Sequence, residues 1–85
     1  MDISKAEQRI MHVLAQGGHI KLEKDTRGKI EKLHCVTRDG WYMSGFSLEL
    51  FRKLKRRRLI ASKGGGPYRA TRLGRVRVRA ELDNR

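Results

Sequence analysis

Hydrophobic residues near the N-terminus recur every three to four positions, which is the period of an amphipathic helix. Ser4 and Glu7 have the spacing of a capping box, so the helix is predicted to begin after Ser4, and the pair Gly17-Gly18 is predicted to end it. An arc of about 100° on this helix carries apolar side chains and is expected to be buried. Its members are Ala6, Ile10, Val13 and Leu14.

The pattern then changes to a period of two, which is typical of strands. Residues 19–23 and 29–36 are predicted to pair as a hairpin, with an Asp- and Gly-containing loop between them. In the second strand the apolar set moves from the even position Ile30 to the odd positions Leu33 and Cys35. A strand of strict period two cannot place all three on one face, so this strand is expected to contain a bulge or to change its burial.

A second helix is predicted in the middle of the chain. Residues 38–40 form a turn and residues 41–43 a short third strand, after which Ser47 is a good N-cap. The helix is expected to end near Arg57, because a further turn would rotate Arg58 onto its apolar face. That apolar face consists of Leu50, Phe51 and Leu54.

The C-terminal third is predicted to contain a hairpin and one more element. Residues 59–62 and 68–71 are predicted as strands, joined by the Gly-rich turn 63–67. Residues 75–80 alternate Arg with Val or Ala, which favours a strand, although a final helix would also accommodate them. The order of elements indicates an α+β fold, a single winged-helix-like domain over residues 1–85 with an additional β-hairpin after the first helix.

Composition narrows the functional classes. A chain of 85 residues with 38% apolar residues supports a small core but no large catalytic cleft. Lys and Arg number 21 against nine Asp and Glu, a formal net charge of +12, so the expected partners are polyanions or acidic protein surfaces. Residues 1–45 carry eight basic and six acidic side chains, whereas residues 46–85 carry thirteen and three. The surface that binds an anionic partner is therefore expected in the C-terminal half.

The sequence indicates a cytoplasmic protein. Cys35 is the single cysteine, so no intramolecular disulfide can form, and small secreted domains usually need two or more. The N-terminus has no basic segment followed by an apolar run, and no stretch approaches the roughly 20 apolar residues that span a bilayer. We therefore expect neither secretion nor a membrane partner.

Residues that could carry chemistry are few and poorly spaced. The candidate zinc ligands lack the spacing of a zinc site; they are His12, His19, His34 and Cys35. The segment 64–67 lacks the Lys-Ser/Thr of a phosphate-binding loop and is better explained as a hairpin tip. Cys35 with a nearby His is the one formal nucleophile, but a lone Cys in an aliphatic strand is usually a small core residue. We expect no enzymatic activity, no cofactor and no metal.

The strongest functional signal is the segment 52–58, in which six of seven residues are basic. Because the opposite face of this helix is expected to be buried, the cations would form a fixed surface that suits phosphate or carboxylate groups. Exposed positions that are almost all Lys and Arg favour contact with a phosphate backbone over reading of base edges, and a solvated basic face without a ligand is the alternative. The contact surface is predicted to consist of Arg52, Lys53, Arg56 and Arg57, with Arg69, Arg72 and Arg75 secondary. Reversing Arg52, Arg56 and Arg57 to Glu is expected to abolish binding and to leave the fold intact.

Several short segments together carry a more specific signal than any one of them, through their order and spacing along the chain. They are His12–Ala15, Cys35 with Arg38 and Gly40, Phe51 with Lys53–Lys55, Leu59-Ile60, Pro67–Arg69, Val78–Ala80 and Leu82–Arg85. In this combination the chain resembles the YjhX family of small bacterial proteins over essentially its whole length.

The family's named member is described as the toxin of a toxin–antitoxin pair that inhibits bacterial DNA topoisomerase I, with an acetyltransferase-like antitoxin as its partner. The resemblance therefore implies that this chain binds and inhibits DNA topoisomerase I. The basic second helix, chosen from its charge, is the expected docking surface. Composition alone favours the alternative, a winged-helix-like module or transcriptional regulator that contacts the phosphates of duplex DNA without a topoisomerase target. No catalytic residues follow from the resemblance.

Overall fold

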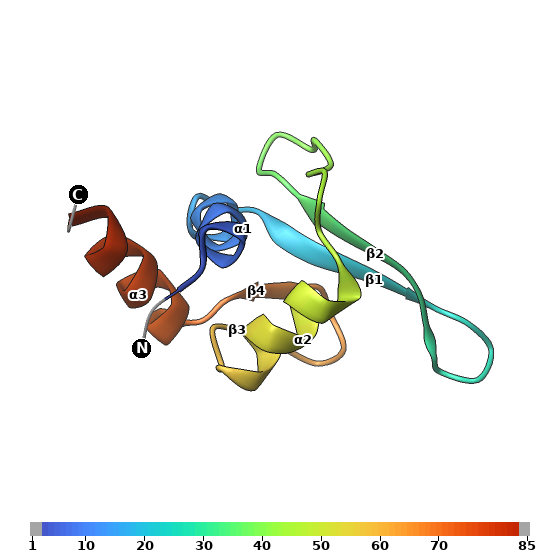
Figure 1. The fold of residues 1–85 in the computed structure, drawn as a ribbon. Helices are drawn as coiled ribbons and strands as arrows, with labels where there is room; N and C mark the ends of the chain where they lie inside the picture. The colour runs from blue at the N-terminus through green and yellow to red at the C-terminus, as the bar shows by residue number, and fades with distance from the viewer. Residues whose placement is uncertain (1–2, 84–85) are drawn as a thin grey trace.

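Three helices and one antiparallel sheet make up the computed structural model, which describes residues 3–83 and the side chains of residues 3–78. The sheet has the strand order β2-β1-β4-β3, and the β1–β2 hairpin projects away from the helices (Figure 1). This arrangement confirms the predicted α+β class. In chain order the elements are α1 (Lys5–Ala15), β1 (His19–Lys24), β2 (Ile30–Val36), α2 (Leu48–Arg56), β3 (Ile60–Ser62), β4 (Tyr68–Ala70) and α3 (Arg72–Asp83).

The first helix begins at the predicted capping box. The Ser4 hydroxyl accepts a hydrogen bond from the backbone N–H of Glu7, and the Glu7 carboxylate accepts one from the N–H of Ser4. The buried arc differs from the prediction, because Ala6 is exposed and Val13 is only half-buried. The arc is rotated toward the side that carries Glu7 and Met11, and the residues buried there are Glu7, Ile10, Met11 and Leu14.

The predicted irregularity of the second strand is a β-bulge. Glu23 pairs with Lys32, but the next residue of β1, Lys24, pairs with Ile30, so one residue of β2 is left over. The extra residue reverses the alternation of side chains, so that Ile30 and Leu33 both pack against the core although their numbers differ in parity.

The short third strand predicted at residues 41–43 is absent from the sheet. Tyr42 makes a single isolated bridge to Val36, and the Thr37 hydroxyl accepts from the Trp41 N–H across the turn at 3.0 Å. A positive φ of 77° at Gly45 then turns the chain toward α2. The ladder therefore ends after one bridge.

Residues 75–80, for which a strand was favoured, are part of α3. The Thr71 hydroxyl accepts from the Gly74 N–H at 3.0 Å and donates to the carbonyl of Arg58 at 2.8 Å, which fixes the first turn of the helix against the preceding hairpin. Val78 is 2% exposed whereas Val76 is 55% exposed, so the two valines do not share one face as they would in a strand. The favoured strand is therefore wrong, and the alternative of a final helix is correct.

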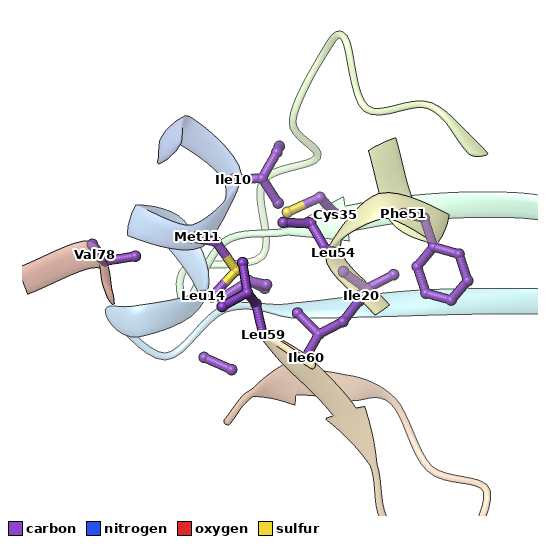
Figure 2. Close-up of a cluster of buried hydrophobic side chains, with 11 residues drawn as sticks. Ile10, Met11, Leu14, Ile20, Cys35, Phe51, Leu54, Leu59, Ile60 and Val78 are labelled. Carbon is purple, nitrogen blue, oxygen red and sulfur yellow. The ribbon is translucent and has the colours of Figure 1, made fainter. Parts of the chain in front are cut away.

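The hydrophobic core lies between the helices and the sheet (Figure 2). In the close-up, α1 and α2 direct their apolar side chains toward β1 and β3, and α3 closes one end through Val78. The described buried members are Ile10, Met11, Leu14, Ile20, Cys35, Phe51, Leu54, Leu59, Ile60, Ala70 and Val78.

A buried carboxylate joins α1 to α2. The side chain of Glu7 is 1% exposed, and the Arg57 Nη1 atom donates to both of its oxygens, at 3.1 and 3.3 Å. The Lys53 Nζ atom lies 3.6 Å from Oε1, although that lysine side chain is 44% exposed. A buried charge is tolerated only when it is paired and hydrogen-bonded, and Glu7 meets both conditions.

Replacing Glu7 with Ala is expected to lower the free energy of unfolding by about 3 kcal/mol, because it removes the acceptor of Arg57 and half of the capping box. Glu7→Gln keeps an acceptor but loses the charge, so its effect is expected to be smaller. Urea denaturation followed by circular dichroism measures both. The control is Glu31→Ala, an exposed position on β2, which should change stability by less than about 0.5 kcal/mol. An equal loss at Glu7 and Glu31 would contradict the role of the ion pair.

Gly74→Ala is expected to destabilise the protein by about 1–3 kcal/mol, because a Cβ at this position would collide with the backbone carbonyl of Leu59. The usual gain of about 1 kcal/mol for Ala over Gly in a helix works in the opposite direction, so the sign of the effect is informative. Val76→Ala, at an exposed position of the same helix, serves as the control and should cause no loss. A stabilised Gly74→Ala variant would show that α3 does not pack against Leu59 in this way.

Candidate functional site

Two of the predicted contact residues lie on the outer face of α2. Arg52 and Arg56 are one helical turn apart, and both are exposed. On the other side of the helix, Phe51 and Leu54 are buried in the core. The helix cannot rotate without exposing these apolar side chains, so the positions from which Arg52 and Arg56 extend are fixed.

The other two predicted contact residues of α2, Lys53 and Arg57, face α1 and pair with Glu7. The expectation that Arg57 could be reversed to Glu without harm to the fold is therefore wrong, since a carboxylate at that position would face the buried carboxylate of Glu7. The sequence indicates that Glu7 needs a cationic partner, although it does not identify Arg57 as that partner. Glu7 lies among Ile10, Met11 and Leu14 on the apolar arc of its helix, where an unpaired carboxylate would not be tolerated.

The three secondary residues come together in a concavity of about 620 Å³ on the β3–β4 hairpin and the start of α3, which we call the basic groove. The Arg75 Nη1 atom donates to the carbonyl of Ala70 at 3.0 Å, which holds that side chain against the hairpin. Two small residues, Ala61 and Gly66, line the groove and leave room for a ligand. The cations that line it are Lys63, Arg69, Arg72 and Arg75.

The basic groove and the outer face of α2 lie on opposite sides of the β3–β4 hairpin. Arg69 pairs with Ala61 across the hairpin and both are exposed, whereas the neighbouring pair Ile60 and Ala70 is buried. Side chains alternate across a strand, so Arg69 points away from the core. On the core side the ring of Tyr68 packs edge-to-face on Phe51 of α2, at a centroid distance of 5.0 Å. The cations of the basic groove therefore lie on a different surface from Arg52 and Arg56.

The basic side chains of the segment 52–58 point in different directions. Lys55 extends toward the sheet, where its Nζ atom lies 5.8 Å from the ring centroid of Tyr68. Arg58 follows the C-cap with a φ of 59°, which ends the helix where the sequence predicted. Of the four predicted contact residues of α2, Arg52 and Arg56 are exposed and are not paired with Glu7.

Cys35 is not placed to act as a nucleophile. Its side chain is fully buried on β2, and burial raises the pKa of its thiol from the ordinary value of 9.0 to about 11, although the nearby Arg9 acts in the opposite direction. The thiolate is the reactive form, so the site disfavours catalysis by this residue.

The described part of the chain contains no cluster of three or more His, Cys, Asp or Glu residues that could hold a metal ion. Among the same residues, no helix has both the length and the apolar character needed to cross a membrane.

The raised pKa of Cys35 predicts slow alkylation. At pH 8 the thiolate fraction is expected to be about 100-fold lower in the folded protein than in the unfolded chain, because the pKa is higher by about two units. Labelling with iodoacetamide in native buffer and in concentrated urea, followed by mass spectrometry, measures the ratio. Equal rates in the two conditions would show that the thiol is accessible and ionisable in the fold.

Comparison with known proteins identifies relatives of this chain. It matches, over residues 1–85, the YjhX toxin family, described as "Putative toxin of bacterial toxin-antitoxin pair". A UPF0386 protein of Chelativorans sp. is 61% identical over the full length of both chains. A UPF0386 protein of Caulobacter vibrioides is 56% identical, covering all of this chain and 93% of the relative. No solved structure matches significantly, and the winged-helix resemblance stays a prediction.

The family match over the whole chain agrees with the resemblance inferred from the short segments of the sequence. Both relatives are identical to this chain at more than half of the aligned positions. On both grounds, this chain belongs to the YjhX toxin family of bacterial toxin–antitoxin pairs.

Proposed function

We propose that this protein acts as a non-enzymatic toxin in the cytoplasm, which binds DNA topoisomerase I and inhibits it through the outer face of α2. The observation that carries the proposal is the exposure of Arg52 and Arg56 on a helix whose opposite face is held in the core by Phe51 and Leu54. The identity of the target comes from the YjhX family resemblance. An acetyltransferase-like antitoxin is the partner that the same resemblance implies.

The chemistry of the outer face supports binding to an acidic surface. The guanidinium fork binds a carboxylate or phosphate through two parallel hydrogen bonds, and two such groups one turn apart can grip neighbouring anions. Because α2 is held by its buried side chains and by the Glu7 pairing, little order has to be imposed on the helix when it binds. Inhibition then requires only that the bound protein blocks the path of DNA or the motion of the enzyme, and no covalent step is needed.

The double variant Arg52→Glu with Arg56→Glu is expected to weaken binding to DNA-free topoisomerase I at least about tenfold, since two attractive contacts become repulsive. Biolayer interferometry measures binding, and relaxation of supercoiled plasmid measures inhibition. Wild-type binding and inhibition by this variant, with a native circular dichroism spectrum, would overturn the assignment.

A matched control keeps the change in net charge the same. Arg27→Glu with Lys29→Glu reverses two exposed cations at the tip of the β1–β2 hairpin, which projects away from α2 (Figure 1). This control is expected to bind and inhibit like the wild type. Equal losses in the two double variants would show that net charge, not the face of α2, drives the interaction.

Binding to duplex DNA without a topoisomerase target is the second candidate function, and the basic groove favours it because four cations line one concavity. Such binding would weaken steeply between about 50 and 200 mM salt, since it depends on release of counterions from phosphates. The same measurements with a short random-sequence duplex separate the two functions. Salt-tolerant binding to topoisomerase I supports the inhibitor, and salt-sensitive binding to the duplex alone supports the DNA-binding module.

A further inference from the structure

Two concavities meet along the exposed side of α3. The first is the basic groove. The second, of about 410 Å³, lies between α1 and α3 and is mainly apolar in its lining. Arg72 and Arg75 line both concavities, so these side chains stand on the ridge between them. The second concavity is lined by His12, Ala15, Gln16, Arg72, Arg75, Val76 and Val78.

The second concavity offers aliphatic contacts next to the guanidinium groups. Val76 is 55% exposed and Ala15 is exposed, while the buried Val78 contributes to the lining. A nucleic-acid backbone presents sugars and phosphates, and it has no aliphatic side chain to place on this surface. A protein segment that carries both carboxylates and aliphatic side chains can use both concavities at once.

The charge on the ridge is not compensated within the described side chains. Neither concavity is lined by an Asp or Glu among residues 3–78, and Arg72 and Arg75 are three positions apart on one helix, where like charges repel. Arg75 donates one hydrogen bond to a backbone carbonyl, which positions the group without neutralising it. An anionic ligand would relieve this repulsion.

We propose that this surface, defined by Arg72, Arg75 and Val76 and called the α3 docking surface, binds an acidic protein segment with aliphatic side chains, and that the antitoxin supplies this segment. Carboxylates of the segment pair with the two arginines, and an aliphatic side chain packs on Val76. The formal net charge of +12 favours an acidic partner. The proposal rests on membership in a toxin–antitoxin family and is independent of topoisomerase inhibition.

Fluorescence anisotropy with designed probes tests the docking surface. The first probe is a labelled peptide of 14 residues with Leu at every third or fourth position and otherwise Glu and Ala. The second peptide has Ser in place of each Leu, and the third has Lys in place of each Glu. The fourth probe is a random-sequence DNA duplex of similar length. The full chain is expected to bind the first peptide about fivefold or more tightly than the second, and the third not at all.

Variants locate the binding on α3. Arg72→Ala and Val76→Ser are each expected to weaken binding of the first peptide about fivefold. Two matched controls are expected to leave it within about twofold: Arg52→Ala removes an exposed arginine of α2, and Trp41→Ser removes an apolar side chain that is 74% exposed on another loop. Circular dichroism verifies that each variant is folded.

The possible outcomes separate cleanly. Loss at Arg72 and Val76 but not in the controls supports the proposal. Equal binding of the first and second peptides, no saturable peptide binding, or tighter Arg72-dependent binding of the duplex would each overturn it, the last in favour of a nucleic-acid site. Because Val76→Ser leaves α2 and the basic groove unchanged, it should inhibit topoisomerase I like the wild type, so failure of this proposal and failure of the inhibitor assignment are distinguishable.

Discussion

The pairing of the buried Glu7 carboxylate with Arg57 is the interaction on which the rest of the arrangement depends. A carboxylate that is 1% exposed would be severely destabilising on its own, so α1 can pack with this face inward only when α2 supplies a cation. The same carboxylate completes the capping box of α1. One side chain therefore sets both where α1 begins and how α2 lies against it.

This constraint sorts the cations of α2 by position. Lys53 and Arg57 compensate a charge inside the protein, whereas Arg52 and Arg56 are exposed and lie outside this pairing. A run of basic residues is thus partly structural, and its density overstates the size of the binding surface. Mutations that treat the run as uniform would confuse loss of binding with loss of fold, because reversal at position 57 puts two carboxylates face to face.

Most of the helices and strands can be predicted from residues that are close to one another in the sequence. The caps at Ser4 and Ser47 and the shift of parity in β2 depend on residues close to one another in the chain, so they could be predicted. The helix α3 could not, because the Thr71 hydroxyl bonds that fix its first turn include one to Arg58, thirteen positions earlier. The same limit applies to the candidate site, whose binding role stays a prediction. Arg57 and Glu7 are 50 positions apart, and no local pattern reveals that they meet.

The two exposed basic surfaces differ in the partner that suits them. The exposed side of α2 presents Arg52 and Arg56 together with the carboxylate of Glu49, whereas α3 sets guanidinium groups beside an exposed valine. If the antitoxin occupies the α3 docking surface, it does not contact Arg52 or Arg56 directly. The molecule measures 26 by 23 Å across its shorter dimensions, which is little more than the width of two packed helices. A folded antitoxin bound to α3 would therefore overhang the neighbouring sides, and it would neutralise the toxin by excluding a large target sterically, without competing for the same arginines.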